Sequence, residues 1–228
     1  MKYTLIVPSG GIGSRVGAEL PKQYIEVNGK TILHWTLSKF SDFDEISQLL
    51  IPADNSYLAE LESSIPSSLI DKYKITQHGA TRFNSIYNAI EHINPDTDYI
   101  IVHDAVRPYI DRNLISHLLE KVQKHHAIVP YMTPTDTIKS IDPDKREDFI
   151  EKTLDRELLA AVQTPQVFER KLFIDSYEYA KKNQFKGTDD SSILEYSNFF
   201  PKLILGNSLN LKITTDVDVQ LANFLLKS

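Results

Sequence analysis

The sequence predicts an α/β fold built on a mainly parallel β-sheet with helices on both faces. Short apolar runs rich in β-branched residues alternate along the chain with segments whose apolar residues recur at helical spacing. Glycine-containing or polar loops follow several of these apolar runs. Such β-α-β alternation is typical of a parallel sheet covered by helices. Because 228 residues is a usual length for one α/β domain, we expect a single domain over residues 1–228.

The expected elements follow one another in a regular order. The predicted strands span residues 5–7, 46–52, 74–76, 99–103, 127–131 and 210–214. The predicted helices span residues 32–40, 56–63, 81–93, 115–124 and 217–226, and another begins near residue 189. Thr81, and either Thr188 or Asp189, are suited to cap helices because their side-chain oxygens accept a backbone N–H of the first turn. Asn28 and Gly29 are typical of a hairpin turn.

One segment, residues 135–160, breaks this alternation. Residues 137–141 and 149–154 show period-two patterns on either side of a turn cluster at residues 142–145, which predicts a β-hairpin. An isolated hairpin is only marginally stable in water. We therefore expect this arm to pack against a second subunit, with packing on its own domain as the alternative.

Composition narrows the class of protein. The chain has no cysteine, so neither a disulfide nor a thiolate site is available, which suits a reducing cytoplasm. No apolar run approaches the ~20 residues of a membrane span, and the first one is too short for a signal peptide. With 25 basic and 31 acidic residues the formal net charge is −6, which argues against nucleic-acid binding. We expect a soluble, cytoplasmic protein with no nucleic-acid or membrane partner.

The first apolar run leads into a glycine loop that indicates a phosphate site. Gly10, Gly11 and Gly13 follow the run, and the cations Arg15 and Lys22 come next. Glycine adopts positive φ and leaves several backbone N–H groups accessible to one anion. A plain turn with two surface cations is the alternative interpretation.

Two common phosphate-binding motifs do not match this loop. The dinucleotide-binding fingerprint needs a third glycine where Val16 stands. The P-loop motif, whose end is imitated by residues 29–31, needs a glycine where Tyr24 stands. The loop therefore fits neither class.

A second polar group, at residues 102–108, lies at the end of a predicted strand. Asp104 could hold a sugar hydroxyl or Mg²⁺, because hard cations prefer carboxylate oxygens. Arg107 could bind a phosphate through two hydrogen bonds, with a local ion pair to Asp104 as the alternative. His103 is expected to have a structural role. Ligands of parallel sheets lie beyond the carboxyl ends of the strands, so we expect this group to lie near the glycine loop.

Several spaced motifs together resemble one enzyme family over nearly the whole chain. They are PSGGIGSR with PKQY, the stretch of residues 79–85, VHDAVRP, the pair TLDR and QTPQ, TDDSS and NLKITT. In this order they are similar to the 2-C-methyl-D-erythritol 4-phosphate cytidylyltransferases of non-mevalonate isoprenoid synthesis. The resemblance implies a Rossmann-like fold of the nucleotide-diphospho-sugar transferase type, with a protruding hairpin arm that joins a homodimer.

The resemblance also implies roles for individual residues. The implied catalytic residues are Arg15, Lys22 and Lys212. The residues implied in binding CTP are Ser9, Gly10, Gly11, Gly13, Gly79, Ser85, Asp104 and Ala105. Those implied in binding the phosphorylated acceptor are Arg107, Thr137, Arg156 and Thr164, of which Thr137 and Arg156 reach the neighbouring subunit. Mg²⁺ is the implied cofactor, with Asp104 as its candidate ligand. Three positions depart from the family pattern: Ser9 and Gly10 stand where alanine is usual, and Ala80 where aspartate is frequent.

The implied reaction transfers CMP from CTP to 2-C-methyl-D-erythritol 4-phosphate and releases pyrophosphate. Ribitol-5-phosphate cytidylyltransferases share most of the motifs, so CDP-ribitol synthesis is the alternative reaction. A non-catalytic nucleotide-binding module is an alternative of a different class. A glycosyltransferase would use a similar sheet and should show a separate Asp-x-Asp metal motif, whereas the match at residues 142–144 lies in a turn cluster.

Overall fold

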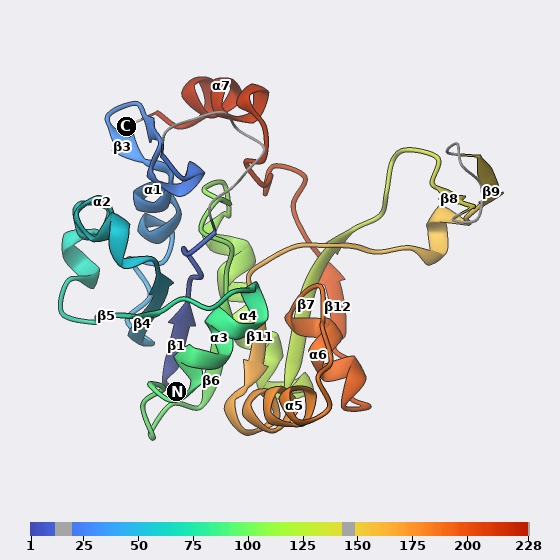
Figure 1. Ribbon diagram of the computed structural model, residues 1–228, viewed down its shortest axis with the longest axis horizontal. Coiled ribbons are helices and arrows are strands. Elements are labelled where there is room, and N and C mark those ends of the chain that lie inside the picture. Colours follow the sequence, from blue (N-terminus) through green and yellow to red (C-terminus); the bar gives the residue numbers. More distant parts are fainter. Residues whose placement is uncertain (12–19, 143–148, 228) are drawn as a thin grey trace.

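The structure, a computed structural model, describes residues 1–11, 20–142 and 149–227. An eight-stranded sheet forms its centre, with the order β10-β7-β11-β6-β1-β4-β5 and with β12 paired to β7 (Figure 1). The strands are β1 (Tyr3–Ile6), β4 (Ile46–Ala53), β5 (Tyr73–Gln77), β6 (Tyr99–Val102), β7 (Ala127–Met132), β10 (Ala161–Val162), β11 (Gln166–Glu169) and β12 (Lys202–Leu205). The predicted α/β class is confirmed.

The parallel part of the sheet is centred on β1. This strand pairs with β4 on one side and β6 on the other, and β5 extends the parallel set beyond β4. Leu5 lies between Leu49 and Ile101 in this register. Successive side chains of a strand point to opposite faces, so Leu5 and Ile6 enter different hydrophobic cores. The continuous apolar runs in the sequence reflect this burial on both faces.

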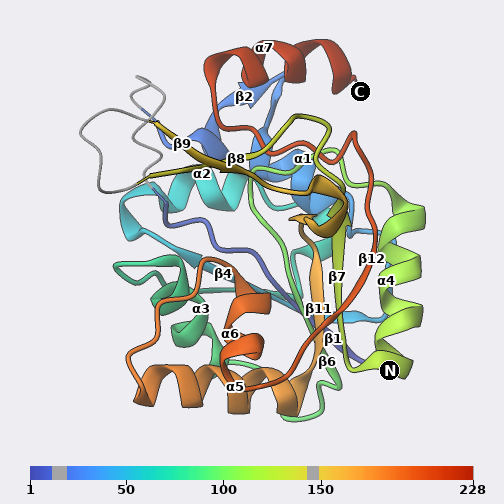
Figure 2. The same ribbon diagram turned by 90° about the vertical axis from the view of Figure 1, so that its right-hand side faces the viewer.

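Helices cover the two faces in separate groups. On the Leu5 face lie α1 (Ile32–Ser38), α2 (Leu58–Ser63) and α4 (Arg112–His125). On the Ile6 face lie α3 (Arg82–Ile90), α5 (Arg170–Lys182) and α6 (Asp190–Tyr196). Figure 2 shows α4 on one side of the sheet and α3 and α6 on the other. The predicted covering of both faces is confirmed.

Side-chain caps explain where several helices begin. The Thr81 side chain accepts the backbone N–H of Asn84, as predicted. Asp189, one of the two candidates, caps α6 in a reciprocal capping box with Ser192. Both caps satisfy N–H groups that a helix start leaves without an intrahelical acceptor.

A small two-stranded hairpin and the last helix lie next to each other beside the main sheet. The predicted turn at Asn28 and Gly29, with φ values of 50° and 78°, joins β2 (Glu26–Val27) to β3 (Lys30–Thr31). The helix α7 (Asp216–Leu225), predicted as 217–226, packs through Ala222 near this hairpin. Across the described ranges, no helix is long and apolar enough to cross a membrane.

The strand predicted at residues 210–214 is wrong, and four elements were not predicted. Residues 210–214 lie outside any strand, with a backbone hydrogen bond from Ile213 to Val106. Apolar Leu211 and Ile213 alternate with polar residues as in a strand, but this segment belongs to no described sheet. The missed elements are α5, β10, β11 and β12. Of these strands, β10 and β11 are antiparallel, which makes the sheet mixed.

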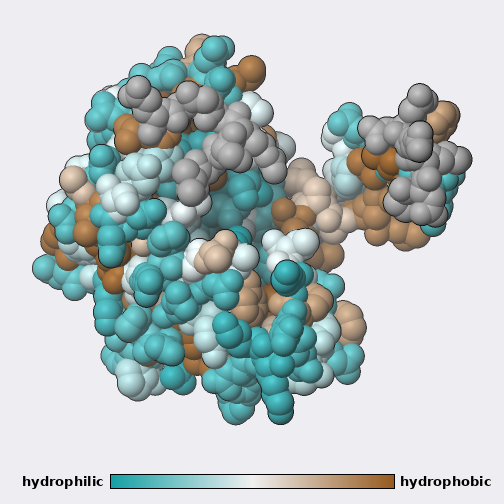
Figure 3. All heavy atoms as spheres, in the orientation of Figure 1, coloured by the Kyte–Doolittle hydropathy of each residue, from teal (hydrophilic) through white to brown (hydrophobic). Residues whose placement is uncertain are grey.

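The predicted hairpin arm stands away from the rest of the molecule. It is formed by β8 (Lys139–Ile141) and β9 (Ile150–Thr153), which pair only with each other among the described strands (Figure 1). Ile141, Ile150 and Leu158 are 57%, 61% and 83% exposed. Figure 3 shows apolar side chains gathered on this arm and near its base. The arm therefore presents apolar surface that the described part of the chain leaves exposed.

Candidate active site

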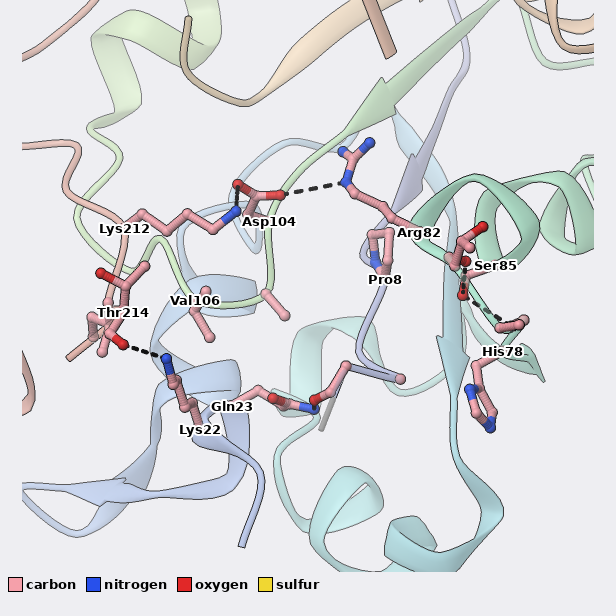
Figure 4. A pocket seen from close by; sticks show the side chains of 17 residues that line it. Pro8, Lys22, Gln23, His78, Arg82, Ser85, Asp104, Val106, Lys212 and Thr214 are labelled. Carbon is pink, nitrogen blue, oxygen red and sulfur yellow. Dashed lines mark hydrogen bonds and ion pairs between the residues drawn. The ribbon is translucent and has the colours of Figure 1, made fainter. Parts of the chain in front are cut away.

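Three loops meet at the carboxyl edge of the parallel strands and enclose a cavity of about 490 Å³. They follow β1, β5 and β6, and the segment 212–214 closes the cavity from the side (Figure 4). The predicted site residues that line it are Gly10, Gly11, Lys22, Gly79, Ser85, Asp104, Ala105 and Lys212. The expected meeting of the glycine loop with the 102–108 group is therefore confirmed.

The Asp104 carboxylate gathers three cations at this cavity. Its Oδ2 lies 3.0 Å from Lys212 Nζ and 3.1 Å from Arg107 Nε, and its Oδ1 lies 3.7 Å from Arg82 Nε. Burial alone would raise the pKa of Asp104, but the three cations outweigh burial and hold this pKa well below its usual range. Asp104 is therefore a fixed negative charge that orders the positive groups around it.

Arg82, which sequence reasoning missed, connects this carboxylate to the protein interior. Its Nη2 lies 2.6 Å from the carboxylate of Asp190, which is fully buried and also accepts the hydroxyl of Tyr177 at 2.6 Å. Burial would lower the pKa of Arg82, but Asp190 and Asp104 raise it above its usual value. The available signal was its place directly after the cap Thr81, inside the stretch of residues 79–85.

Lys22 lies across the cavity from Asp104 (Figure 4). It begins a short 3-10 helix, is largely buried and donates a hydrogen bond to the Thr214 carbonyl. The next residue, Gln23, donates to the Ser9 carbonyl at 2.5 Å and so fastens this helix to the glycine loop. Gly13 and Arg15 lie outside the described residues.

Other predicted residues lie beside the cavity instead of lining it. Ser9 is buried and its hydroxyl donates to the Val7 carbonyl at 3.3 Å. Arg107 is held by Asp104, as the alternative interpretation proposed, and by the Asn210 carbonyl, to which its Nη1 donates at 2.8 Å. Arg107 does not line the cavity, so its direct contact with phosphate stays a prediction.

Thr137 and Arg156 belong to the arm and are not brought to the cavity of their own chain. Arg156 donates to the Thr135 carbonyl at 2.8 Å, within the arm itself. Neither residue is among those that line the cavity. Their predicted contact with an acceptor at a neighbouring subunit stays a prediction.

Thr164 and His103 form a hydrogen-bonded chain beneath Asp104. The backbone N–H of Asp104 donates to Thr164 Oγ1 at 3.0 Å, and this hydroxyl lies 3.0 Å from His103 Nδ1. His103 Nε2 lies 3.1 Å from the Arg107 carbonyl. Since a carbonyl only accepts, we assign the proton to Nε2, which leaves Nδ1 to accept from the hydroxyl. The fully buried His103 has the structural place expected of it, and burial lowers its pKa to about 4.

The glycine loop, the buried Lys22 and the cations around Asp104 lie at the carboxyl edge of the parallel strands, where open α/β sheets bind ligands such as nucleotides. The comparisons with known proteins show which class of α/β protein this is. A family model described as "IspD: 2-C-methyl-D-erythritol 4-phosphate cytidylyltransferase" matches residues 3–228. The chain belongs to this family, and its predicted nucleotidyltransferase class is confirmed.

Individual relatives agree with the family model. A 2-C-methyl-D-erythritol 4-phosphate cytidylyltransferase of Actinobacillus pleuropneumoniae is 38% identical over 99% of this chain and 96% of its own. The corresponding protein of Clostridioides difficile is 31% identical over 98% of this chain and 93% of its own. The crystal structure of the Francisella tularensis protein superposes with a TM-score of 0.82 at 30% identity, covering 99% of this chain and 100% of that one.

We predict that His103 makes the stability of the fold depend on pH below neutrality. The unfolded imidazole has a pKa near 6.5, whereas burial lowers the folded value to about 4. The unfolded chain thus binds this proton more readily. The titration of His103 therefore leaves the free energy of unfolding unchanged above pH ~6.5 and lowers it by about 3 kcal/mol as the pH drops to about 4. Urea unfolding at intervals between pH 7.5 and 4.5 measures this slope.

The matched variant for this test is His103→Gln, which can still donate to the Arg107 carbonyl but does not titrate. Its unfolding free energy should be lower at pH 7.5 and should fall less steeply toward pH 4.5. Equal slopes for the variant and the unaltered protein would contradict the role assigned to His103.

Proposed function

We propose that this protein transfers CMP from CTP to 2-C-methyl-D-erythritol 4-phosphate. A phosphate oxygen of the acceptor forms a bond to the α-phosphorus of CTP, and the bond from that phosphorus to the β-phosphate oxygen breaks and releases pyrophosphate. Cationic groups at one end of a cavity formed by a glycine loop are the observation that carries this proposal. A cytoplasmic location and one domain over residues 1–228 are part of the same proposal.

The chemistry needs alignment and charge neutralisation, not a protein nucleophile. Lys22 and Lys212 both lie toward one end of the cavity, with their ammonium groups held by Thr214 and Asp104 (Figure 4). Because these cations are already positioned, little reorganisation is needed when charge develops on the leaving pyrophosphate. Each such contact is worth on the order of 3 kcal/mol in the barrier. Arg15 is proposed as a third cation of this set.

The described residues fit a Mg²⁺ ion that is shared with the substrate. Asp104 is the only carboxylate in the described lining, and no described group of three or more metal-binding side chains could hold a metal by itself. Mg²⁺ is commonly bound through one or two carboxylates together with substrate phosphates. Asp104 would hold such an ion, which would neutralise phosphate charge.

We also propose that the arm, residues 135–160, joins two copies of the chain. Ile141, Ile150 and Leu158 expose apolar side chains on it, and burial of such surface stabilises association. Arg156 would then reach the acceptor phosphate in the cavity of the partner subunit. This arrangement gives a reason for an arm that carries a predicted binding residue away from its own cavity.

The arm proposal predicts that Ile150→Glu yields a monomer. A buried carboxylate would oppose docking, so sedimentation equilibrium should show the mass of one chain. The KM for the acceptor should rise at least about tenfold, since a charge-assisted hydrogen bond from Arg156 is lost with the partner. The matched control is Glu151→Gln, a polar change at the next residue, which should leave both the mass and the KM unchanged. A dimeric, fully active Ile150→Glu protein would contradict the proposal.

The acceptor is tested by pyrophosphate release from CTP and Mg²⁺ in parallel reactions. We expect 2-C-methyl-D-erythritol 4-phosphate to be used at least about tenfold faster than ribitol-5-phosphate, because a polar site rejects an alcohol that leaves its groups unpaired. Release with ribitol-5-phosphate alone would instead support CDP-ribitol synthesis. Binding of CTP with no release in either reaction would support a non-catalytic nucleotide-binding module.

A further inference from the structure

The backbone of the glycine loop lies directly against the side chain of His78. A Cβ atom placed on Gly10 would lie only 2.4 Å from His78 Cβ and 2.8 Å from its Cγ. Such distances are impossible without movement of one of the two segments, because protein interiors are close-packed. Gly10 is therefore glycine because His78 occupies the adjacent space. Both residues line the cavity.

The two ends of the cavity differ, because lysines lie toward only one of them. Lys22 and Lys212 lie toward one end, and His78 and Ser85 lie toward the other (Figure 4). Arg82 lies between these ends, but its guanidinium is committed to Asp104 and Asp190. A nucleoside triphosphate carries all of its negative charge on the phosphates, so Coulomb attraction orients these toward the lysines. The base is thereby directed toward His78.

Side chains that could read the base are scarce at the end of the cavity near His78. Ala80 contributes only a methyl group, and the Ser85 hydroxyl donates to the Thr81 carbonyl and accepts the Gly79 N–H. His78 is the largest side chain that lines this end within the described residues. Its backbone is anchored by a hydrogen bond to the Ala53 carbonyl at 3.3 Å, directly after β5.

The position of the His78 ring follows from its packing against the glycine loop. Its Cβ, Cγ and Nδ1 atoms are the three nearest to the place that a Cβ of Gly10 would take. A flat side chain packed in this way forms a wall beside the base.

We propose that His78 is a specificity-determining residue that forms the wall of the base site and limits it to a single-ring base. The inference rests on the proposed cytidylyltransferase function, because it assumes that a nucleoside triphosphate occupies the cavity. An imidazole against the glycine loop supplies a flat surface for a pyrimidine and takes the space that the second ring of a purine would need. Discrimination between CTP and UTP is assigned to other groups.

The test compares the binding of CTP, UTP and ATP by calorimetry in His78→Gly and His78→Phe. We expect His78→Gly to bind CTP about tenfold more weakly, because the variant lacks the ring on which the base would stack. It should also lose most of the preference for CTP over ATP. His78→Phe should retain that preference because it keeps a flat ring. The ratio of CTP to UTP affinity should stay the same in both variants.

A double-mutant cycle with Gly10→Ala tests the steric part of the proposal. In the unaltered background the added methyl group should weaken CTP binding about tenfold or more, because His78 or the loop must move. In the His78→Gly background the same change should have little effect. The matched control is His126→Gly, at an exposed left-handed position with φ 63°, which should leave all three affinities unchanged.

Two outcomes would overturn the inference. One is an unchanged preference for CTP over ATP in His78→Gly, and the other is a shift in the CTP to UTP ratio instead. Either result in a protein that still releases pyrophosphate would leave the proposed function standing. If the unaltered protein binds no nucleotide at all, both the proposed function and the inference fail.

Discussion

The structure of the site depends on one carboxylate that is surrounded by three cations. Asp104 lies at the end of β6, Arg82 begins α3, and Lys212 comes from the irregular segment after β12. Without Asp104 these positive groups would repel one another across a cavity of about 490 Å³. With it they converge on one small volume before any substrate is present. These charges are therefore in place before a ligand binds, and electrostatic preorganisation is the largest catalytic term in many enzymes.

The surrounding fold holds that carboxylate from two directions. Its backbone N–H is fixed by Thr164, which is oriented in turn by the buried His103. Its side chain is held by Arg82, which is anchored to the fully buried Asp190. Removing one partner of a buried ion pair leaves an uncompensated charge and strongly destabilises a protein. The same contacts therefore link the stability of the fold to the geometry of the site.

Local patterns were sufficient to predict most of the fold and the position of the site. Alternating apolar segments defined the parallel core, and the cap at Thr81 needed only its own neighbours. Segment 210–214 was mistaken for a strand because apolar Leu211 and Ile213 alternate with polar residues, whereas hydrogen bonding with a neighbouring strand is not encoded locally. The pair of Arg82 and Asp190, 108 residues apart, depends on tertiary packing that one sequence does not reveal.

The most direct test of this account is a double-mutant cycle on the rate of pyrophosphate release, with Asp104→Asn, Lys212→Gln and the combined variant. If Asp104 acts by ordering Lys212, the two changes are coupled, and the double variant should be at least about fivefold faster than the product of the two single effects predicts. Circular dichroism at the assay temperature verifies that each variant is folded. Effects that multiply independently would show that Asp104 and Lys212 act separately, and would contradict the account.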